Sequence, residues 1–285
     1  MGAPGTDRRE TCALRRHPVS RAGRAPLEDR PWDAANVAEL LAANRLPLAY
    51  APPEEVQVLR DWSRQRNRLS RNHARILHGV KSLMNSNNRP GPERLTSARL
   101  TGYLTAYGEK LPERHVRMLW QNVRQLSLIE EEIDVCEREI VRLLAQPRFA
   151  AAAALLVSIP GVGPVTSATV LAEIGDFRRF PDGKAIGRYA GLTPRLHASG
   201  GKERHGHISK TGPSDLRWVL QQAAWTAIRC DAAIKKQWLK MSRGDKKKSA
   251  AVGIARKLLV LMRHLVVHNQ TYESRVEAPQ AAATE

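Results

Sequence analysis

The chain has 285 residues, of which 42% are apolar and 5% aromatic, and it carries 46 Lys and Arg against 28 Asp and Glu. The apolar fraction is sufficient for a folded core and argues against a chain that is disordered throughout. A formal net charge of +18, with a pI near 10.5, indicates a polyanionic partner, of which nucleic acid is the commonest.

The sequence argues against several other classes of protein. The longest apolar run, from Ala150 to Val157, is too short to span a bilayer, and the arginine-containing N-terminus has no apolar core typical of a signal peptide. The cysteines, Cys12, Cys136 and Cys230, form no CxxC pair, which argues against a zinc ribbon or a disulfide scaffold. We therefore expect a reduced cytoplasmic protein, associated with the nucleoid and not with a membrane.

The chain is expected to become ordered only after an Arg-, Pro- and Gly-rich segment. Residues 1–28 show no helical or strand period, so we predict disorder there, and also in the tail 273–285. A short helix is predicted from Asp33, whose carboxylate suits the free N–H groups and the positive dipole at a helix N-terminus. The prolines at positions 52 and 53 then interrupt the chain.

Two long helices are predicted next, from Glu54 to about Leu83 and from about Glu113 to Ala145. In the first, the seam residues are Leu59, Trp62, Arg66, Leu69, His73, Ile76, Val80 and Leu83. In the second, they are Val116, Leu119, Val123, Leu126, Ile129, Ile133, Cys136, Ile140 and Leu143. Spacings of three and four residues are typical of heptads, so we predict a coiled-coil region over 54–146. The helices can pair with each other or with copies from another subunit, and we expect a homo-oligomer.

The last predicted unit, 147–272, holds most of the charge. Ala150 to Tyr272 contains 20 Lys and Arg against 7 Asp and Glu. Helices are predicted near 150–158, 164–174, 183–189, 213–229 and 249–268. This concentration of positive charge predicts that the unit carries the nucleic-acid contacts.

The first motif of this unit is the Gly-Val-Gly turn between two apolar helices, Ile159 to Ile174. It resembles the glycine turn of a helix-hairpin-helix. Backbone N–H groups at Gly161, Gly163 and Val165 can hold a phosphate at a helix N-terminus. A turn that only packs two helices is the alternative. A nucleotide-binding P-loop is disfavoured because no GK[ST] follows.

The second motif is the Gly-rich span from Tyr189 to Gly212, which contains Ser199. A serine hydroxyl can attack a phosphodiester where neighbouring cations hold the phosphate. The candidate cations are Arg195, Lys202, Arg204 and Lys210, and the candidate proton carriers are His197, His205 and His207. The alternative is a mobile basic loop that touches DNA phosphates.

Five sequence blocks carry a resemblance to a known family. They are Leu155 to Pro164, Arg188 to Pro194, Ala198 to Lys202, Ile208 to Gly212, and Ala255 to Leu259. In order and spacing these blocks resemble the C-terminal domain of the transposases of insertion sequences 110, 116 and 902, over about residues 150–268. Residues 33–85 also resemble that family.

The resemblance implies a recombinase. Such transposases have an N-terminal RuvC-like α/β nuclease fold with four acidic residues that bind Mg²⁺, a coiled-coil insertion and this C-terminal domain. A serine attacks DNA to form a phosphoserine link, and a structured RNA from the element guides target choice. Ser199 matches that serine. Asp33 matches a catalytic acidic residue, and Asp29 is the nearest preceding acid.

The N-terminal part departs from the family pattern. The family has Asp-x-x-Asp-Ala where this chain has Arg30 before Asp33-Ala34, and the residues before Asp33 show no strand pattern. We therefore expect residues 29–53 to be only a remnant of the RuvC-like domain, in a truncated chain. Two or three carboxylates do not rebuild a four-carboxylate metal site.

Taken together, the sequence predicts a mainly α protein. It would comprise a coiled-coil helical arm and a helical C-terminal transposase domain, 147–272, with a helix-hairpin-helix motif. The expected function is DNA binding. Cutting and rejoining of DNA through Ser199 and metal-bound acidic residues is the activity that the resemblance implies for intact members of the family. The alternatives are a non-catalytic helix-hairpin-helix DNA-binding module, and an inactive or RNA-binding remnant that acts on intact copies.

Overall fold

The computed structural model describes residues 30–45, 50–199, 202–242 and 246–273. The chain divides into two compact units, 1–53 and 54–285. The disorder predicted for 1–28 and for the tail falls almost entirely outside the described residues.

The described part of the first unit contains one helix and no strand. Helix α1 runs from Arg30 to Ala42, three residues earlier than the start predicted at Asp33. Pro31 lies in its first turn, where the missing N–H leaves no intrahelical bond unmade. Asp33 is therefore the fourth residue of α1 and not its cap. After the helix, Asn44 adopts φ +51° and the Arg45 N–H donates to the Leu40 carbonyl, an end typical of helices.

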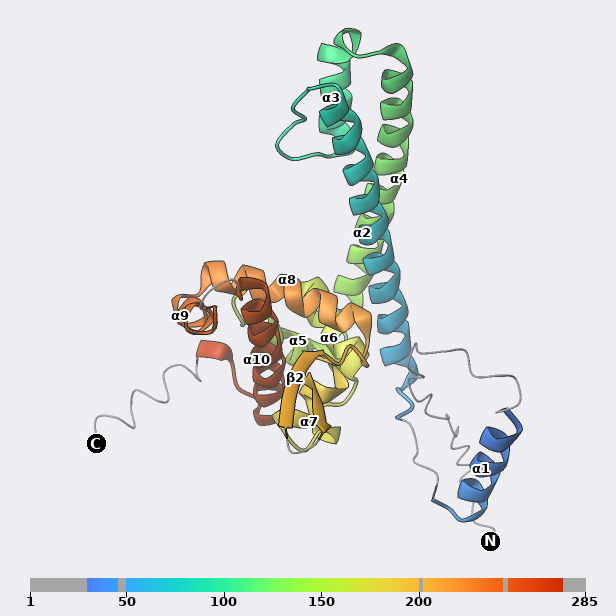
Figure 1. Ribbon diagram of the computed structural model, residues 1–285, viewed down its shortest axis with the longest axis vertical. Helices are drawn as coiled ribbons and strands as arrows, with labels where there is room; N and C mark the ends of the chain where they lie inside the picture. The colour runs from blue at the N-terminus through green and yellow to red at the C-terminus, as the bar shows by residue number, and fades with distance from the viewer. Residues whose placement is uncertain (1–29, 46–49, 200–201, 243–245, 274–285) are drawn as a thin grey trace. The chain divides into compact units, whose positions relative to one another are not determined.

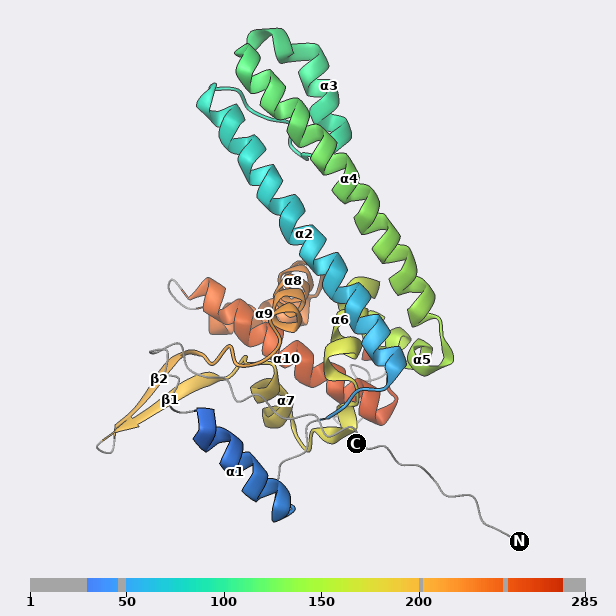
Figure 2. The same ribbon diagram turned by 90° about the vertical axis from the view of Figure 1, so that its right-hand side faces the viewer.

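In the second unit, two long helices pair as an antiparallel hairpin within the chain. Helix α2 runs from Glu54 to Ser86 and α4 from Glu113 to Leu144, so both predicted helices are confirmed. They lie side by side over most of their length (Figure 1, Figure 2). Of the two pairings that the sequence allowed, the structure has the one within the chain.

In the N-terminal half of α2, the buried residues differ from those of the predicted seam. Ser63 and Asn67 are buried there, whereas Trp62 and Arg66 are only half-buried. The reason is that this part of α2 packs on α6 as well as on α4, so its buried face is not set by one partner helix. Ser63 Oγ and both polar atoms of the Asn67 side chain have no hydrogen-bond partner, which is costly in a buried site.

At the tip of the α2–α4 hairpin, a third helix, α3, packs with α2 and α4. Helix α3 runs from Ser97 to Tyr107 and is followed by a short 3₁₀ turn, Gly108 to Lys110. The sequence reasoning missed α3. Its apolar residues Leu100 and Leu104 are buried against α4. Glu130 of α4 holds the start of α3, because its carboxylate accepts hydrogen bonds from the backbone N–H and the hydroxyl of Ser97.

The same carboxylate also bonds His73 of α2, with 3.0 Å between Nε2 and Oε1. Burial raises the pKa of Glu130, but the hydrogen bonds from Ser97 and His73 outweigh it, so the net effect is a lowered pKa. A carboxyl whose pKa is lower in the folded state stabilises that state above the unfolded pKa and loses this contribution as the pH falls.

We expect acid to loosen α3 before the rest of the arm. As the pH falls below about 4.5, the usual Glu pKa, protonation of Glu130 weakens its bonds to Ser97 and His73. The protection of the α3 amides from hydrogen exchange, corrected for the intrinsic effect of pH on exchange, should therefore fall across this range in the wild type. In Glu130→Gln the protection should already be low at neutral pH and change less with acid. Equal pH profiles in the two proteins would contradict the assignment.

The C-terminal part of this unit is a helical domain with one small sheet. Its elements are α5 (Pro147–Val157), α6 (Pro164–Ile174), a 3₁₀ turn (Phe177–Arg179), α7 (Gly183–Tyr189), β1 (Pro194–Ser199), β2 (Lys202–Ile208), α8 (Ser214–Cys230), α9 (Ala232–Met241) and α10 (Lys247–His268). The mainly α fold is confirmed, and each of the five predicted helices is present. The hairpin β1–β2 and helix α9 were not predicted.

The core of this domain forms where α6, α8 and α10 meet. Every residue of α6 from Ser167 to Ile174 is buried, and α10 contributes Leu258, Leu259 and Met262. Across the described ranges, no single helix is long and apolar enough to cross a membrane. One bent pair, α4 with α5 at 106°, passes by length and composition.

Candidate nucleic-acid interface

The turn between α5 and α6 contains the two glycines singled out in the sequence, and they have different roles. Gly161 has φ +87°, and a Cβ there would lie 2.6 Å from the backbone nitrogen of Ala227 in α8. Close packing therefore requires glycine at position 161, since a side chain there would collide with the backbone of α8. Gly163 has an ordinary extended backbone (φ −97°, ψ 178°), and a Cβ there would meet nothing within 4 Å.

Gly163 is the N-cap residue of α6, and Pro164 begins the helix. A helix N-terminus presents free N–H groups and positive partial charge, which suit a phosphate oxygen. The open space at Gly163 leaves room for the approach of such a group. Of the predicted phosphate contacts, Gly163 thus has the geometry for one, whereas Gly161 serves the fold.

The hairpin β1–β2 replaces the loop considered for residues 194–208. The strands are antiparallel, with an irregularity between Pro194 and Leu196. The sequence did contain a signal, because Gly200 and Gly201 separate the strands and a two-residue Gly-Gly connection is typical of a β-hairpin. We did not predict the hairpin from this signal because both strands are largely polar.

Ser199 is the last residue of β1 and pairs with Lys202, the first residue of β2. His197 pairs with Arg204. Residues directly opposite each other, and those two apart on one strand, belong to the same face of a ladder. The register therefore puts positions 197, 199, 202 and 204 on one face at the end of the hairpin. The side chains of residues 196–205 lie outside the described part.

At the base of the β1–β2 hairpin, the chain at Gly212 crosses close to the chain at Tyr189. A Cβ at Gly212 would lie 1.8 Å from the Tyr189 carbonyl oxygen, so only glycine fits there. Arg217 of α8 donates to the carbonyls of Ala190 and Gly212, and burial lowers its pKa. Arg195 donates to the Ser209 carbonyl at 3.1 Å. The motif glycines and Arg217 thus fix where the strand bearing Ser199 leaves the domain.

The other predicted cations lie around this base. Arg195, Lys210 and His207 are exposed, and Lys210 adopts φ +54° while its N–H donates to the Gly191 carbonyl. Lys202 and Arg204 follow in β2. The structure thus brings the predicted cations onto one hairpin and the loop that follows it.

The candidate metal ligands belong to the first unit of the chain. Asp33 lies in α1, in the first unit, and Asp29 is outside the described residues. The described residues contain no group of three or more His, Cys, Asp or Glu that could hold a metal ion. A magnesium ion takes six oxygen ligands, usually one or two carboxylates with waters and substrate oxygens. The assembled donors therefore do not fit a magnesium site by themselves.

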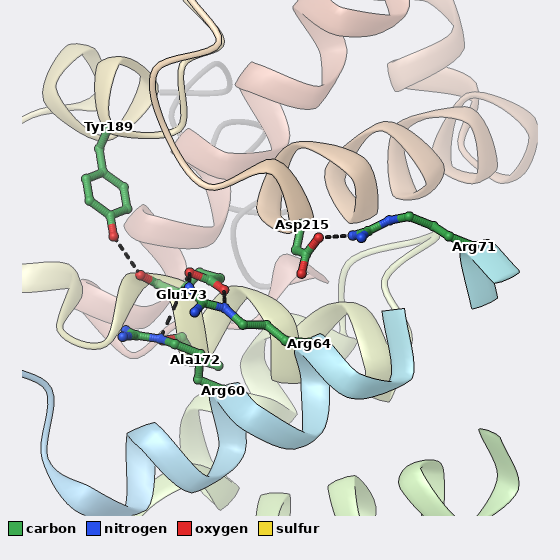
Figure 3. A network of polar contacts seen from close by, with 7 residues as sticks. All are labelled: Arg60, Arg64, Arg71, Ala172, Glu173, Tyr189 and Asp215. Atoms are coloured by element: carbon green, nitrogen blue, oxygen red, sulfur yellow. Dashed lines mark hydrogen bonds and ion pairs between the residues drawn. The ribbon is translucent and has the colours of Figure 1, made fainter. Parts of the chain in front are cut away.

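Sequence reasoning missed a polar network that holds α2 against this domain (Figure 3). Glu173 of α6 is 2% exposed and accepts two hydrogen bonds from Arg64, at 2.7 and 3.0 Å. These bonds raise the pKa of Arg64 above its usual value. Arg60 donates to the neighbouring Ala172 carbonyl, and the Tyr189 hydroxyl donates to the Glu173 carbonyl.

Arg71, two turns further along α2, pairs with Asp215 in the first turn of α8 and lies over the ring of Trp218, 5.9 Å from its centroid. The arginines of α2 and their partners in this network are more than 100 residues apart in sequence, which is why no local pattern predicted these pairs. The network therefore holds α2, and with it the α2–α4 arm, in a fixed direction against the C-terminal domain that bears β1 and β2.

The comparisons with known proteins define the class. Residues 153–239 match the sequence model described as the transposase IS116/IS110/IS902 family. This match covers α6–α8, both strands, most of α9 and the C-terminal part of α5. A probable family 20 transposase of Pseudomonas aeruginosa is 31% identical over 205 residues, 70% of this chain and 59% of the relative. A putative transposase of Sinorhizobium fredii is 29% identical over 269 residues, 86% of this chain and 67% of the relative.

A pilin gene-inverting protein of Moraxella bovis is 31% identical over 159 residues, 54% of this chain and 48% of that protein. Residues 153–239 thus form a domain of the IS116/IS110/IS902 transposase family, and over longer stretches the chain is similar to proteins named as transposases. It spans 59% of the length of the Pseudomonas relative.

Proposed function

We propose that this chain binds DNA and takes part in cutting and rejoining DNA during transposition of an insertion sequence, with Ser199 as the nucleophile. The single observation that carries the proposal is the position of Ser199. It ends β1 at the tip of a hairpin, opposite Lys202, in a domain with a large excess of cations. A serine at such a tip can reach a duplex that the rest of the domain holds.

The proposed step is a phosphoryl transfer. The Ser199 hydroxyl gives up its proton and attacks a DNA phosphorus atom, and a serine–phosphate bond forms. The bond from phosphorus to a sugar oxygen breaks, and that oxygen leaves with a proton. Lys202, Arg204 and Arg195 are the candidates to balance the charge that develops on the phosphate. His207 is an exposed candidate proton carrier.

Further parts of the proposal come from the family. They are a helix-hairpin-helix role for the α5–α6 turn, a guide RNA, and assembly of copies through the coiled-coil arm. Mg²⁺, with Asp33 and Asp29 as candidate ligands, is also proposed. The ion would supply charge stabilisation at the reacting phosphate, but the present donors do not assemble a site, so no step is assigned to it.

The experiment is the trapping of a covalent protein–DNA adduct with the purified chain, element DNA and Mg²⁺. We expect an adduct with the wild type and none with Ser199→Ala, because alanine has no oxygen to bond phosphorus. Ser209→Ala is the matched control, ten residues on in the same motif, and should still form the adduct. An adduct that survives Ser199→Ala would overturn the assignment.

The open N-cap at Gly163 favours a second candidate, a DNA-binding module without strand chemistry. In that case, Ser199→Ala would change nothing, and replacements at Gly163 would weaken a salt-sensitive binding reaction.

A further inference from the structure

The outward face of α2 carries a row of positive charge. Its members recur every three or four residues, so those from Arg64 to His78 share one side of the helix, and Lys81 continues the row about 100° further round the helix from Arg64. They are Arg64, Arg68, Arg71, Arg75, His78 and Lys81, and all are exposed. From Trp62 to Ser86, α2 has no Asp or Glu.

Two of these six residues are already neutralised by carboxylates. Arg64 pairs with Glu173 and Arg71 pairs with Asp215, so both serve the junction with the domain. Arg68 donates only to Gln65 and Arg75 only to Asn72, which are neutral partners. Within the described ranges, no ion pair involves Arg68, Arg75 or Lys81. We call these three residues the outer cationic row.

The partner helix does not compensate the row. Carboxylates of α4 pair with the inward-facing residues of α2, as Glu137 does with Arg66 and Glu130 with His73. The exposed side of α4 is mixed, because five arginines are interspersed with four acidic residues: Arg114, Arg117, Arg124, Arg138 and Arg142 with Glu113, Glu131, Glu132 and Asp134. The two faces of the arm therefore differ, and only the α2 face concentrates positive charge. Such a face attracts a polyanion.

We propose that the outer cationic row binds the phosphate backbone of duplex DNA, as a second contact beyond the domain that bears Ser199. The inference rests on the proposed DNA-binding function. Arg68 and Lys81 are separated by 13 residues, which is about 20 Å at 1.5 Å per residue. A row of exposed cations of this length suits the regular backbone of a duplex, which is contacted by charge without reading bases.

The composition of the row disfavours single-stranded nucleic acid. Single strands are held by aromatic side chains on which the bases stack, and the row contains none. The nearest aromatic ring in the network, that of Trp218, is covered by Arg71. The row also continues from the point where Arg71 meets α8, so a duplex held by the domain can extend along the arm.

The test is a triple variant, Arg68→Gln with Arg75→Gln and Lys81→Gln. Its matched control is Arg114→Gln with Arg124→Gln and Arg138→Gln on α4, which removes the same charge from the other face. Affinity for a long duplex is measured over a range of salt. With a slope of about −0.9 per phosphate contact, we expect the row variant to lose about 2 to 3 from the slope of log K against log salt.

At low salt, the row variant should also bind the duplex about tenfold or more weakly, and the control should change the slope by less than about 1. Equal effects of the two variants would overturn the proposal. So would a loss confined to single-stranded or folded RNA. A changed oligomeric state in sedimentation with unchanged duplex binding would assign the row to the acidic residues of a second copy, and would also overturn it.

Failure of the proposed function is distinguishable from failure of this inference. An adduct that depends on Ser199, with duplex affinity and salt slope the same in the row variant and the wild type, would refute the row alone. A row-dependent salt slope with no adduct would refute the serine chemistry and support the row.

Discussion

Arg64→Met is expected to lower the free energy of unfolding by about 3 kcal/mol, one of the largest effects of any surface arginine in the chain. The substitution leaves the Glu173 carboxylate in a site that is 2% exposed. The cation that then remains near Glu173 is Arg60, whose Nε lies 4.0 Å from Glu173 Oε2. Removing one partner of a buried pair costs about 3 to 5 kcal/mol, because the other charge is left uncompensated. The lower end applies because only Glu173 is buried, the side chain of Arg64 being 51% exposed, and because Arg60 remains.

The control for this prediction is Arg68→Met, one turn further along α2. Arg68 is exposed and contacts only Gln65, so its loss should change stability by less than about 0.5 kcal/mol. The double variant Arg64→Met with Glu173→Met should recover most of the loss, because no buried charge then remains. Chemical denaturation of the four proteins measures these differences. Equal, small losses in the two single variants would show that Arg64 does not stabilise Glu173.

The helices were predictable wherever an apolar period was long. Residues of α2, α4, α6, α8 and α10 repeat at three and four over several turns, and these helices begin and end close to the predicted positions. Helix α9 was not predicted, because only one of its residues, Ile234, is buried and gives no apolar period. Helix α3 was not predicted, although Thr96 caps its N-terminus locally, because only two of its residues, Leu100 and Leu104, are buried and they give no long apolar period.

The candidate site was predictable as a set of residues but not as an arrangement. Ser199 and its neighbouring cations were found because serine, glycine and basic residues cluster in sequence. Their arrangement as a hairpin was missed, since neither strand alternates apolar and polar residues clearly. The roles of Gly161 and Gly163 could not be separated in sequence, because the close approach of Ala227 comes from a helix 66 residues further on.

The second large effect is expected at the turn between α5 and α6, where the two glycines should respond in opposite ways. Gly161→Ala should destabilise the domain by about 3 kcal/mol or more. A side chain at φ +87° is strained by about 1 to 2 kcal/mol, and its Cβ would lie 2.6 Å from the Ala227 nitrogen, which adds an overpacking cost of about 1 to 3 kcal/mol. Thermal unfolding measures the loss.

Gly163→Asp should keep or raise stability, because Asp is a preferred N-cap and its charge suits the helix dipole. The same carboxylate would occupy the place proposed for a DNA phosphate, so duplex affinity should fall about tenfold or more. Gly163→Asn is the matched control, since Asn caps equally well without the charge and should bind nearly as the wild type does.

The Asp and Asn variants therefore separate the two interpretations of the turn. Both keep the cap of α6, so they differ only in a negative charge at its N-terminus. If Asp and Asn bind DNA equally, the turn serves only to pack α5 and α6 against α8, and the phosphate contacts of the domain lie elsewhere. If only Asp loses affinity, the turn positions DNA next to the domain from which the Ser199 hairpin extends.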